Sequence, residues 1–210
     1  MQLVFQDRLA TAAPGFKERI KAIDTDLKKN VEPGFLGFLR NQVVRDIATL
    51  QTLLDTVAEE SLREAVGYLK DAEIIYIAGQ YRSEPVALFT RYLMTMLRRR
   101  VILLDSAGGL ATEIAGTVSR RDVLIAIAFR HYAKEVITIA ENAAANGTPV
   151  VAITDNQLSP LVKDASVLFT IPEDEYSFAH SLAAPMSLVQ AIAVALASVL
   201  QQDGDKASNL

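Results

Sequence analysis

A possible anion-binding turn lies between Gly79 and Ser83. An apolar run over residues 74–78 ends at Gly79, and a polar turn and then a helical pattern follow. A strand, a glycine turn and a helix N-terminus together present unpaired N–H groups and a partial positive charge. Arg82 could add a full charge, and the Ser83 hydroxyl could both cap the helix and contact a ligand oxygen. An ordinary β–α turn with a serine cap explains the same residues, because short glycine motifs arise often by chance.

Two further clusters follow later apolar runs. Arg130, His131 and Lys134 can all be cationic, and they stand at the start of a helical pattern, where positive side chains oppose the helix dipole. Either solvation or a bound anion would resolve that conflict. Later, Ser159 before Pro160 predicts a helix N-cap with proline at the first helical position. Thr154 and Asp155 could form hydrogen bonds with sugar hydroxyls, or Asp155 could close an Asx turn.

Composition limits the classes of protein to consider. The chain has 210 residues, half of them apolar, and a net charge of -4, which indicates one sizeable core in a mildly acidic protein. The absence of cysteine excludes disulfides and thiolate metal sites, and two histidines argue against a histidine metal site, so we predict neither a metal nor a cofactor. The N-terminus does not resemble a signal peptide, and the most apolar stretch, residues 187–200, is too short for a membrane span. We expect a cytoplasmic protein without a membrane segment.

The chain alternates between strand and helix patterns after residue 70. The predicted strands are continuous apolar runs at 73–78, 101–104, 122–128, 149–153 and 167–169. Such runs indicate a parallel sheet that is covered on both faces. Helical patterns lie between them, at 84–97, 108–117, 132–146 and 159–163, and Gly147 is expected to stop the third. The sequence therefore predicts an α/β protein, a three-layer α/β/α sandwich, whose ligands bind at the carboxyl ends of the strands.

Helical patterns also flank the predicted sheet. One long helix, with a possible kink, is predicted over residues 39–69, and Ser61 with Glu64 resembles a capping box that restarts it. This helix packs either against a partner subunit or a neighbouring domain, or as a brace within the chain. A last helix is predicted over 178–201. We divide the chain into a short helical segment (1–38), the α/β unit with its leading helix (39–202) and a polar tail (203–210).

Three stretches resemble the SIS (sugar isomerase) domain. They are IYIAGQYRS, DVLIAIAFRHYAKEV and GTPVVAITDNQLSPLVKDAS, and the last is the most specific. The leading helix and the turns after the first and third predicted strands resemble RpiR-type transcriptional regulators, which place a helix-turn-helix domain before a phosphosugar-sensing SIS domain. The resemblance implies a flavodoxin-like five-stranded parallel sheet, a homodimer or tetramer, and a phosphosugar at the strand ends near a subunit interface.

The resemblance also assigns roles to particular residues. Ser83 would bind phosphate, Arg82, Arg130 and Tyr132 would lie on the rim, and Thr154 and Ser159 would flank the pocket. Four positions depart from the family pattern: Tyr81 replaces the usual second glycine of the first turn, Ala128 a serine, Ala133 a serine or threonine, and Ser166 an aspartate. Either charge compensates for the lost hydroxyl donors, through Arg82, Arg130, His131 and Lys134, or the ligand differs from that of the family.

Three functions follow from these observations. The first, which we favour, is a non-catalytic phosphosugar sensor related to the RpiR-type regulators. The second is an aldose–ketose phosphosugar isomerase, with Glu175 or Glu113 as the base and His180 as the ring-opening group, although a solvated acidic loop also explains residues 173–180. The third, a DNA-binding repressor, is disfavoured because residues 1–38 are too short for a full helix-turn-helix domain.

Overall fold

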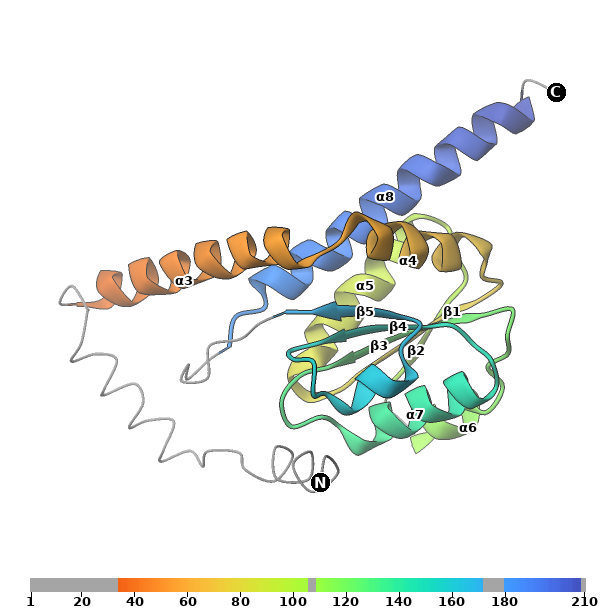
Figure 1. Ribbon diagram of the computed structural model, residues 1–210, viewed down its shortest axis with the longest axis horizontal. Helices are drawn as coiled ribbons and strands as arrows, with labels where there is room; N and C mark the ends of the chain where they lie inside the picture. Colours follow the sequence, from red (N-terminus) through yellow and green to blue (C-terminus); the bar gives the residue numbers. More distant parts are fainter. Residues whose placement is uncertain (1–33, 106–108, 172–179, 209–210) are drawn as a thin grey trace.

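A parallel sheet of five strands forms the centre of the molecule, with helices on both faces (Figure 1). The computed structural model describes residues 34–105, 109–171 and 180–208. The strands are β1 (Ile75–Gly79), β2 (Val101–Leu104), β3 (Val123–Ala128), β4 (Val150–Thr154) and β5 (Val167–Thr170), in the order β2-β1-β3-β4-β5. Every neighbouring pair is parallel. The predicted three-layer sandwich with a flavodoxin-like sheet is confirmed.

The strand order places one switch point in the sheet. The chain leaves β1 toward β2 at one edge and later returns to add β3 on the other side of β1. Gly79, the last residue of β1, is in register with Ile127 near the end of β3. The turns that follow these two strands therefore start side by side, and a crevice between neighbouring turns of this kind is where open α/β sheets bind ligands.

Each face of the sheet packs against its own set of helices. Helices α4 (Glu59–Asp71), α5 (Glu84–Met96) and α8 (Ala183–Ser208) cover one face, and α6 (Ala111–Ala115), α7 (Lys134–Ala145) and the 3-10 helix η3 (Pro160–Asp164) cover the other. In β1, Ile75 and Ile77 enter the first core while Tyr76 and Ala78 enter the second. Both faces of each central strand are buried, which explains why the strands read as continuous apolar runs.

The predicted long leading helix is two helices. Helix α3 (Phe35–Thr56) ends before Val57, and α4 begins at Glu59 after an extended Ala58. The predicted capping box is wrong, because Ser61 lies inside α4 and the N-cap, Ala58, has no side-chain hydrogen bond. Glu59 and Glu60 in the first turn of α4 complement the helix dipole instead.

The last helix differs from its prediction at both ends. Helix α8 starts at Ala183 and continues to Ser208, through most of the segment predicted as a polar tail. Residues 178–179 lie outside the described part of the chain. Among the described residues, α8 is the one helix long and apolar enough to cross a membrane by length and composition. Its buried Leu188, Ile192 and Leu196 belong to the core between α8 and the sheet, as expected for a core helix.

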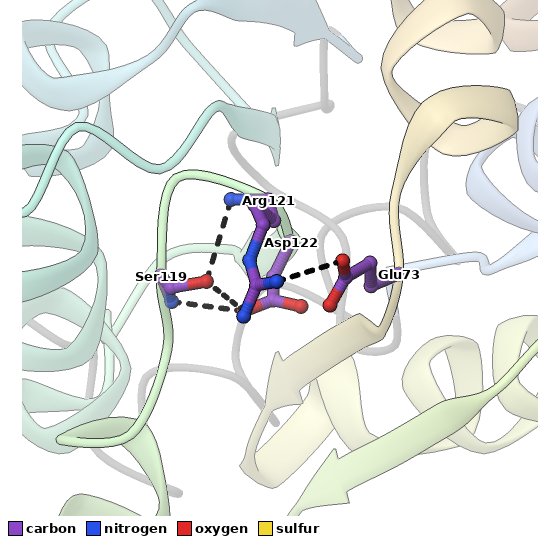
Figure 2. A network of polar contacts seen from close by, with 4 residues as sticks. All are labelled: Glu73, Ser119, Arg121 and Asp122. Atoms are coloured by element: carbon purple, nitrogen blue, oxygen red, sulfur yellow. Dashed lines mark hydrogen bonds and ion pairs between the residues drawn. The ribbon is translucent and has the colours of Figure 1, made fainter.

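A polar network fixes the start of β3 at the amino edge of the sheet, opposite the switch-point turns (Figure 2). The carboxylate of Asp122 accepts hydrogen bonds from the backbone N–H (2.9 Å) and the hydroxyl (2.8 Å) of Ser119. Arg121 donates from its backbone N–H to the Ser119 hydroxyl at 3.3 Å and forms an ion pair with Glu73 at 3.1 Å. Because Glu73 precedes β1, these contacts tie the starts of β1 and β3 together.

Helices α5 and α7 end in the same hydrogen-bonded motif with different residues. In α7, Gly147 (φ 76°) donates to the carbonyl of Ala144, and Thr148 donates to that of Ala143. This is a Schellman motif, and it confirms Gly147 as the predicted stop. In α5 the equivalent left-handed position is Arg98 (φ 56°), which donates to Thr95 while residue 99 donates to residue 94.

Candidate ligand-binding site

The turn after β1 is a single 3-10 turn, η1 (Tyr81–Ser83), that leads directly into α5. Gly79 is required here by packing: a Cβ at this position would lie 2.9 Å from the Cβ of Ala87 on α5 and 3.2 Å from the carbonyl oxygen of Ser83. Ser83 is the N-cap of α5, but its hydroxyl makes no capping bond. The expected capping role is therefore wrong, and this hydroxyl has a different partner.

Two contacts join the turn after β1 to the turn after β3. The buried Ser83 hydroxyl accepts a hydrogen bond from the backbone N–H of Phe129 at 3.3 Å. The guanidinium carbon of Arg82 lies 4.6 Å from the centre of the Phe129 ring, a cation–π contact. The sequence predicted ligand binding at the carboxyl ends of the strands, and the strand order brings these two turns together at that edge.

Asp155, after β4, organises the turn between β3 and α7. Its buried carboxylate accepts hydrogen bonds from the Tyr132 hydroxyl (2.7 Å) and the backbone N–H of Arg130 (3.2 Å). The Thr154 hydroxyl lies 3.3 Å from the same carboxylate. The sequence left open a ligand contact or an Asx turn for Asp155. The Asx-type bond is made by the next residue, Asn156, whose side-chain oxygen accepts from Leu158 N at 2.6 Å.

A second carboxylate bridges three elements at the same edge. Glu135, in the first turn of α7, accepts a hydrogen bond from the Gln80 side chain and another, at 3.4 Å, from the hydroxyl of Thr112 on α6. Reasoning from the sequence missed this bridge and the Asp155 network. Acidic residues near a helix start are common, and only the adjacency of β1 and β3 shows that Glu135 and Gln80 meet.

The remaining predicted ligand contacts fall into two groups. The hydroxyls of Thr154 and Ser159 are buried, and each has a backbone partner: Thr154 donates to the Ala128 carbonyl at 2.7 Å, and Ser159 accepts from Leu161 N at 3.4 Å. The predicted N-cap at Ser159 is confirmed. In contrast, His131 and Lys134 are exposed, Arg130 is half-buried, and Tyr132 is buried with its hydroxyl on Asp155. The accessible positive charge therefore lies in the turns after β1 and β3.

The predicted catalytic residues are not brought together in the described part of the chain. Glu175 lies outside the described residues, and His180 is half-buried three residues before α8 begins. Glu113 is exposed on α6, a short helix at the carboxyl edge of β2. An acid–base pair thus stays a prediction from the sequence.

The SIS domain family matches residues 68–195, more than half of the chain. The chain belongs to the SIS domain family. Among solved structures, this SIS protein is similar to the sugar isomerase domain of an RpiR transcription factor from Sphaerobacter thermophilus (20% identity, TM-score 0.69, covering 78% of this chain and 96% of that chain).

Two further structures share its fold. They are the Vibrio vulnificus NanR protein complexed with ManNAc-6P (21% identity, TM-score 0.72, covering 91% and 71%) and the phosphoheptose isomerase GmhA from Neisseria gonorrhoeae (15% identity, TM-score 0.66, covering 79% and 100%). Among curated proteins, none matches the sequence of this chain. The fold therefore includes both regulators and isomerases.

Proposed function

We propose that this SIS protein binds a phosphosugar at the carboxyl edge of its sheet, between the turns after β1 and β3, and that it acts as a sensor without catalysis. The observation that carries the proposal is the pairing of these turns, which each supply an arginine, at the switch point. The family match supports the class of ligand, and the ManNAc-6P complex of NanR provides a first compound to test.

Arginine, in place of hydroxyl groups, would hold the phosphate. Arg82 is kept near Phe129 by the cation–π contact, and Arg130 is fixed by its backbone bond to Asp155. The Nε atom of Arg130 is buried and has no hydrogen-bond acceptor among the described residues. A guanidinium group presents a planar set of donors that matches phosphate oxygens, and such charge-assisted bonds are about twice as strong as neutral ones. Ser83 could still donate its hydroxyl proton to the ligand, because it accepts from Phe129.

A thermal-shift series tests this site. ManNAc-6P, glucose 6-phosphate and fructose 6-phosphate at about 100 times their Kd would each add roughly 2.7 kcal/mol to the stability of a binding protein. We expect Arg82→Gln and Arg130→Gln each to reduce the shift strongly. Arg120→Gln is the matched control, since Arg120 is exposed at the opposite edge of the sheet. A wild-type protein that no phosphosugar stabilises would refute the proposal.

A regulator and an isomerase differ in whether they convert the phosphosugar that they bind. If the protein is a sensor, ManNAc-6P and the ketose and aldose phosphates should remain chemically unchanged in an NMR assay with the wild-type protein. Conversion that is lost in Glu175→Gln or Glu113→Gln would establish the isomerase and overturn the non-catalytic assignment. A gel shift at low salt with the DNA upstream of its own coding region tests the disfavoured repressor function, and a specific shift would support it.

We also propose self-association through the face that α3, α5 and α8 form. Of the large apolar side chains exposed in the described chain, most lie on these helices, including a stripe of Leu88, Tyr92 and Met96 along α5. On the face that α6, α7 and η3 cover, the exposed large apolar side chains of the described structure are two separate residues, Leu110 before α6 and Leu158 before η3. Exposed apolar areas of this extent mark interaction sites, and a second copy is the partner that the family resemblance implies. Light scattering should give a dimer or larger, and Tyr92→Glu should lower the mass, whereas Thr138→Glu on exposed α7 should not. A monomeric wild type would refute this.

A further inference from the structure

Two residues at the proposed phosphosugar site adopt a backbone conformation that normally belongs to glycine. Tyr81 has φ 55° and His131 has φ 76°, and they stand in the two turns that meet at the switch point. In the left-handed region the Cβ atom lies too close to the following carbonyl oxygen, so any residue except glycine destabilises the folded state there. Glycine at either position would remove that cost.

A third residue of this kind provides an internal comparison. In the described chain, the non-glycine residues with positive φ are Tyr81, Arg98 and His131. Arg98 occupies the Schellman position of α5, for which Gly147 is the counterpart in α7. Arg98 thus bears the same conformational cost at the amino edge of the sheet, away from the proposed site.

Burial of the side chain does not offset the cost of the left-handed backbone conformation at Tyr81. Its side chain is 73% exposed, although tyrosine is a large aromatic residue, and His131 is exposed as well. Ser83 and Arg82 join the two turns through their contacts with Phe129, and Gln80 contacts Glu135. The other exposed apolar side chains at this edge, Leu110 and Leu158, follow β2 and β4. An aromatic group held out on a strained backbone is placed for contact with something outside the fold.

We propose that Tyr81 and His131 recognise the sugar portion of the phosphosugar, while the arginines of the same turns hold its phosphate. The tyrosine ring packs on the apolar C–H face of the sugar, and the imidazole forms hydrogen bonds with its hydroxyls. Residues that determine specificity thereby replace glycine in both turns, at a cost in stability. This inference rests on the proposed phosphosugar site and adds which residues select the sugar.

The test compares three glycine variants: Tyr81→Gly, His131→Gly and Arg98→Gly. All three should raise the melting temperature by a few degrees, because each removes the same kind of strain. By calorimetric titration, Tyr81→Gly and His131→Gly should weaken binding of ManNAc-6P, or of the best phosphosugar in the panel, by about tenfold or more. Arg98→Gly should bind like the wild type. Protection by inorganic phosphate should be unchanged in all three, because the arginines and Ser83, which would bind the phosphate group, are left in place.

A second substitution separates loss of the ring from gain of backbone freedom. Asparagine tolerates the left-handed conformation without the flexibility of glycine, so Tyr81→Asn should weaken phosphosugar binding as much as Tyr81→Gly does. Wild-type affinity in Tyr81→Asn, or in both site glycine variants, overturns the inference while the phosphosugar site itself stands. A wild-type protein that binds inorganic phosphate but no phosphosugar overturns both the inference and the proposed function.

Discussion

Gly79→Ala tests whether the glycine of the first turn serves packing between α5 and β1. The added methyl would lie 2.9 Å from the Cβ of Ala87 and 3.5 Å from the Cβ of Ile127. Carbon atoms in contact prefer about 3.5–4.0 Å, so the first distance is too short by more than half an ångström. Ala87 is fully buried, and its Cβ is attached to helix backbone, so no flexible side chain can move aside.

The expected loss of stability follows from these distances. Overpacking a core costs about 1–3 kcal/mol, and the contact with helix backbone places this case in the upper half of that range. A gain of about 0.4–1 kcal/mol from reduced unfolded-state entropy opposes the loss, since Gly79 does not have positive φ. The net destabilisation is about 1–2.5 kcal/mol. For a domain of this size, that lowers the melting temperature by roughly 3–10 °C.

A double-mutant cycle with Ala87→Gly makes the prediction specific. Ala87→Gly alone should destabilise α5 by about 1 kcal/mol through helix propensity, with a further loss of buried methyl contact. In the double variant the methyl has moved from one side of the contact to the other, so we expect the combination to be more stable than the sum of the single changes by about 1–2 kcal/mol. Urea unfolding of the four proteins measures this coupling. Equal stability of Gly79→Ala and the wild type, or strict additivity, would refute the packing argument.

Further predictions concern the contacts that hold the site and the sheet. Tyr132→Phe removes the hydroxyl that donates to the buried Asp155 and should cost about 1.5–3 kcal/mol in urea unfolding; a change below about 0.5 kcal/mol would show that the bond contributes little. Arg99→Gln removes a guanidinium that donates to the carbonyl oxygens of residues 70 (3.0 Å) and 72 (2.7 Å) at the end of α4, and a loss of about 2 kcal/mol is expected, which an unchanged urea midpoint would disprove. Arg121→Gln breaks the exposed ion pair with Glu73, so its effect should stay below about 1 kcal/mol and shrink further in high salt.

Part of the site was predictable because strand, turn and helix signals are local. The apolar runs located all five strands, and the parallel arrangement then required the turns after them to share one edge. The sequence predicted a helix stop at Gly147 and a helix N-cap at Ser159, and both predictions are confirmed. The SIS resemblance of three short stretches is confirmed by the family match over residues 68–195.

The errors came from features that local patterns do not determine. The break between α3 and α4 has no proline, glycine or capping side chain, so a helical period alone could not place it at Val57 and Ala58. The extension of α8 to Ser208 was missed because the polar composition of residues 203–208 was taken as a tail. The packing role of Gly79 was also missed, because its distance to Ala87 is set only once α5 packs against β1.

The sequence by itself determined the five strands, their parallel arrangement and the family, because apolar runs, turn residues and motif spacing are properties of the chain. Only the tertiary structure determined which residues contact one another at the site. The order β2-β1-β3 places Phe129 on Ser83 and Arg82, and β4 beside β3 places Asp155 on Tyr132. These pairs are 23 to 47 residues apart in the chain. No local rule relates them, since each contact exists only after the sheet has formed.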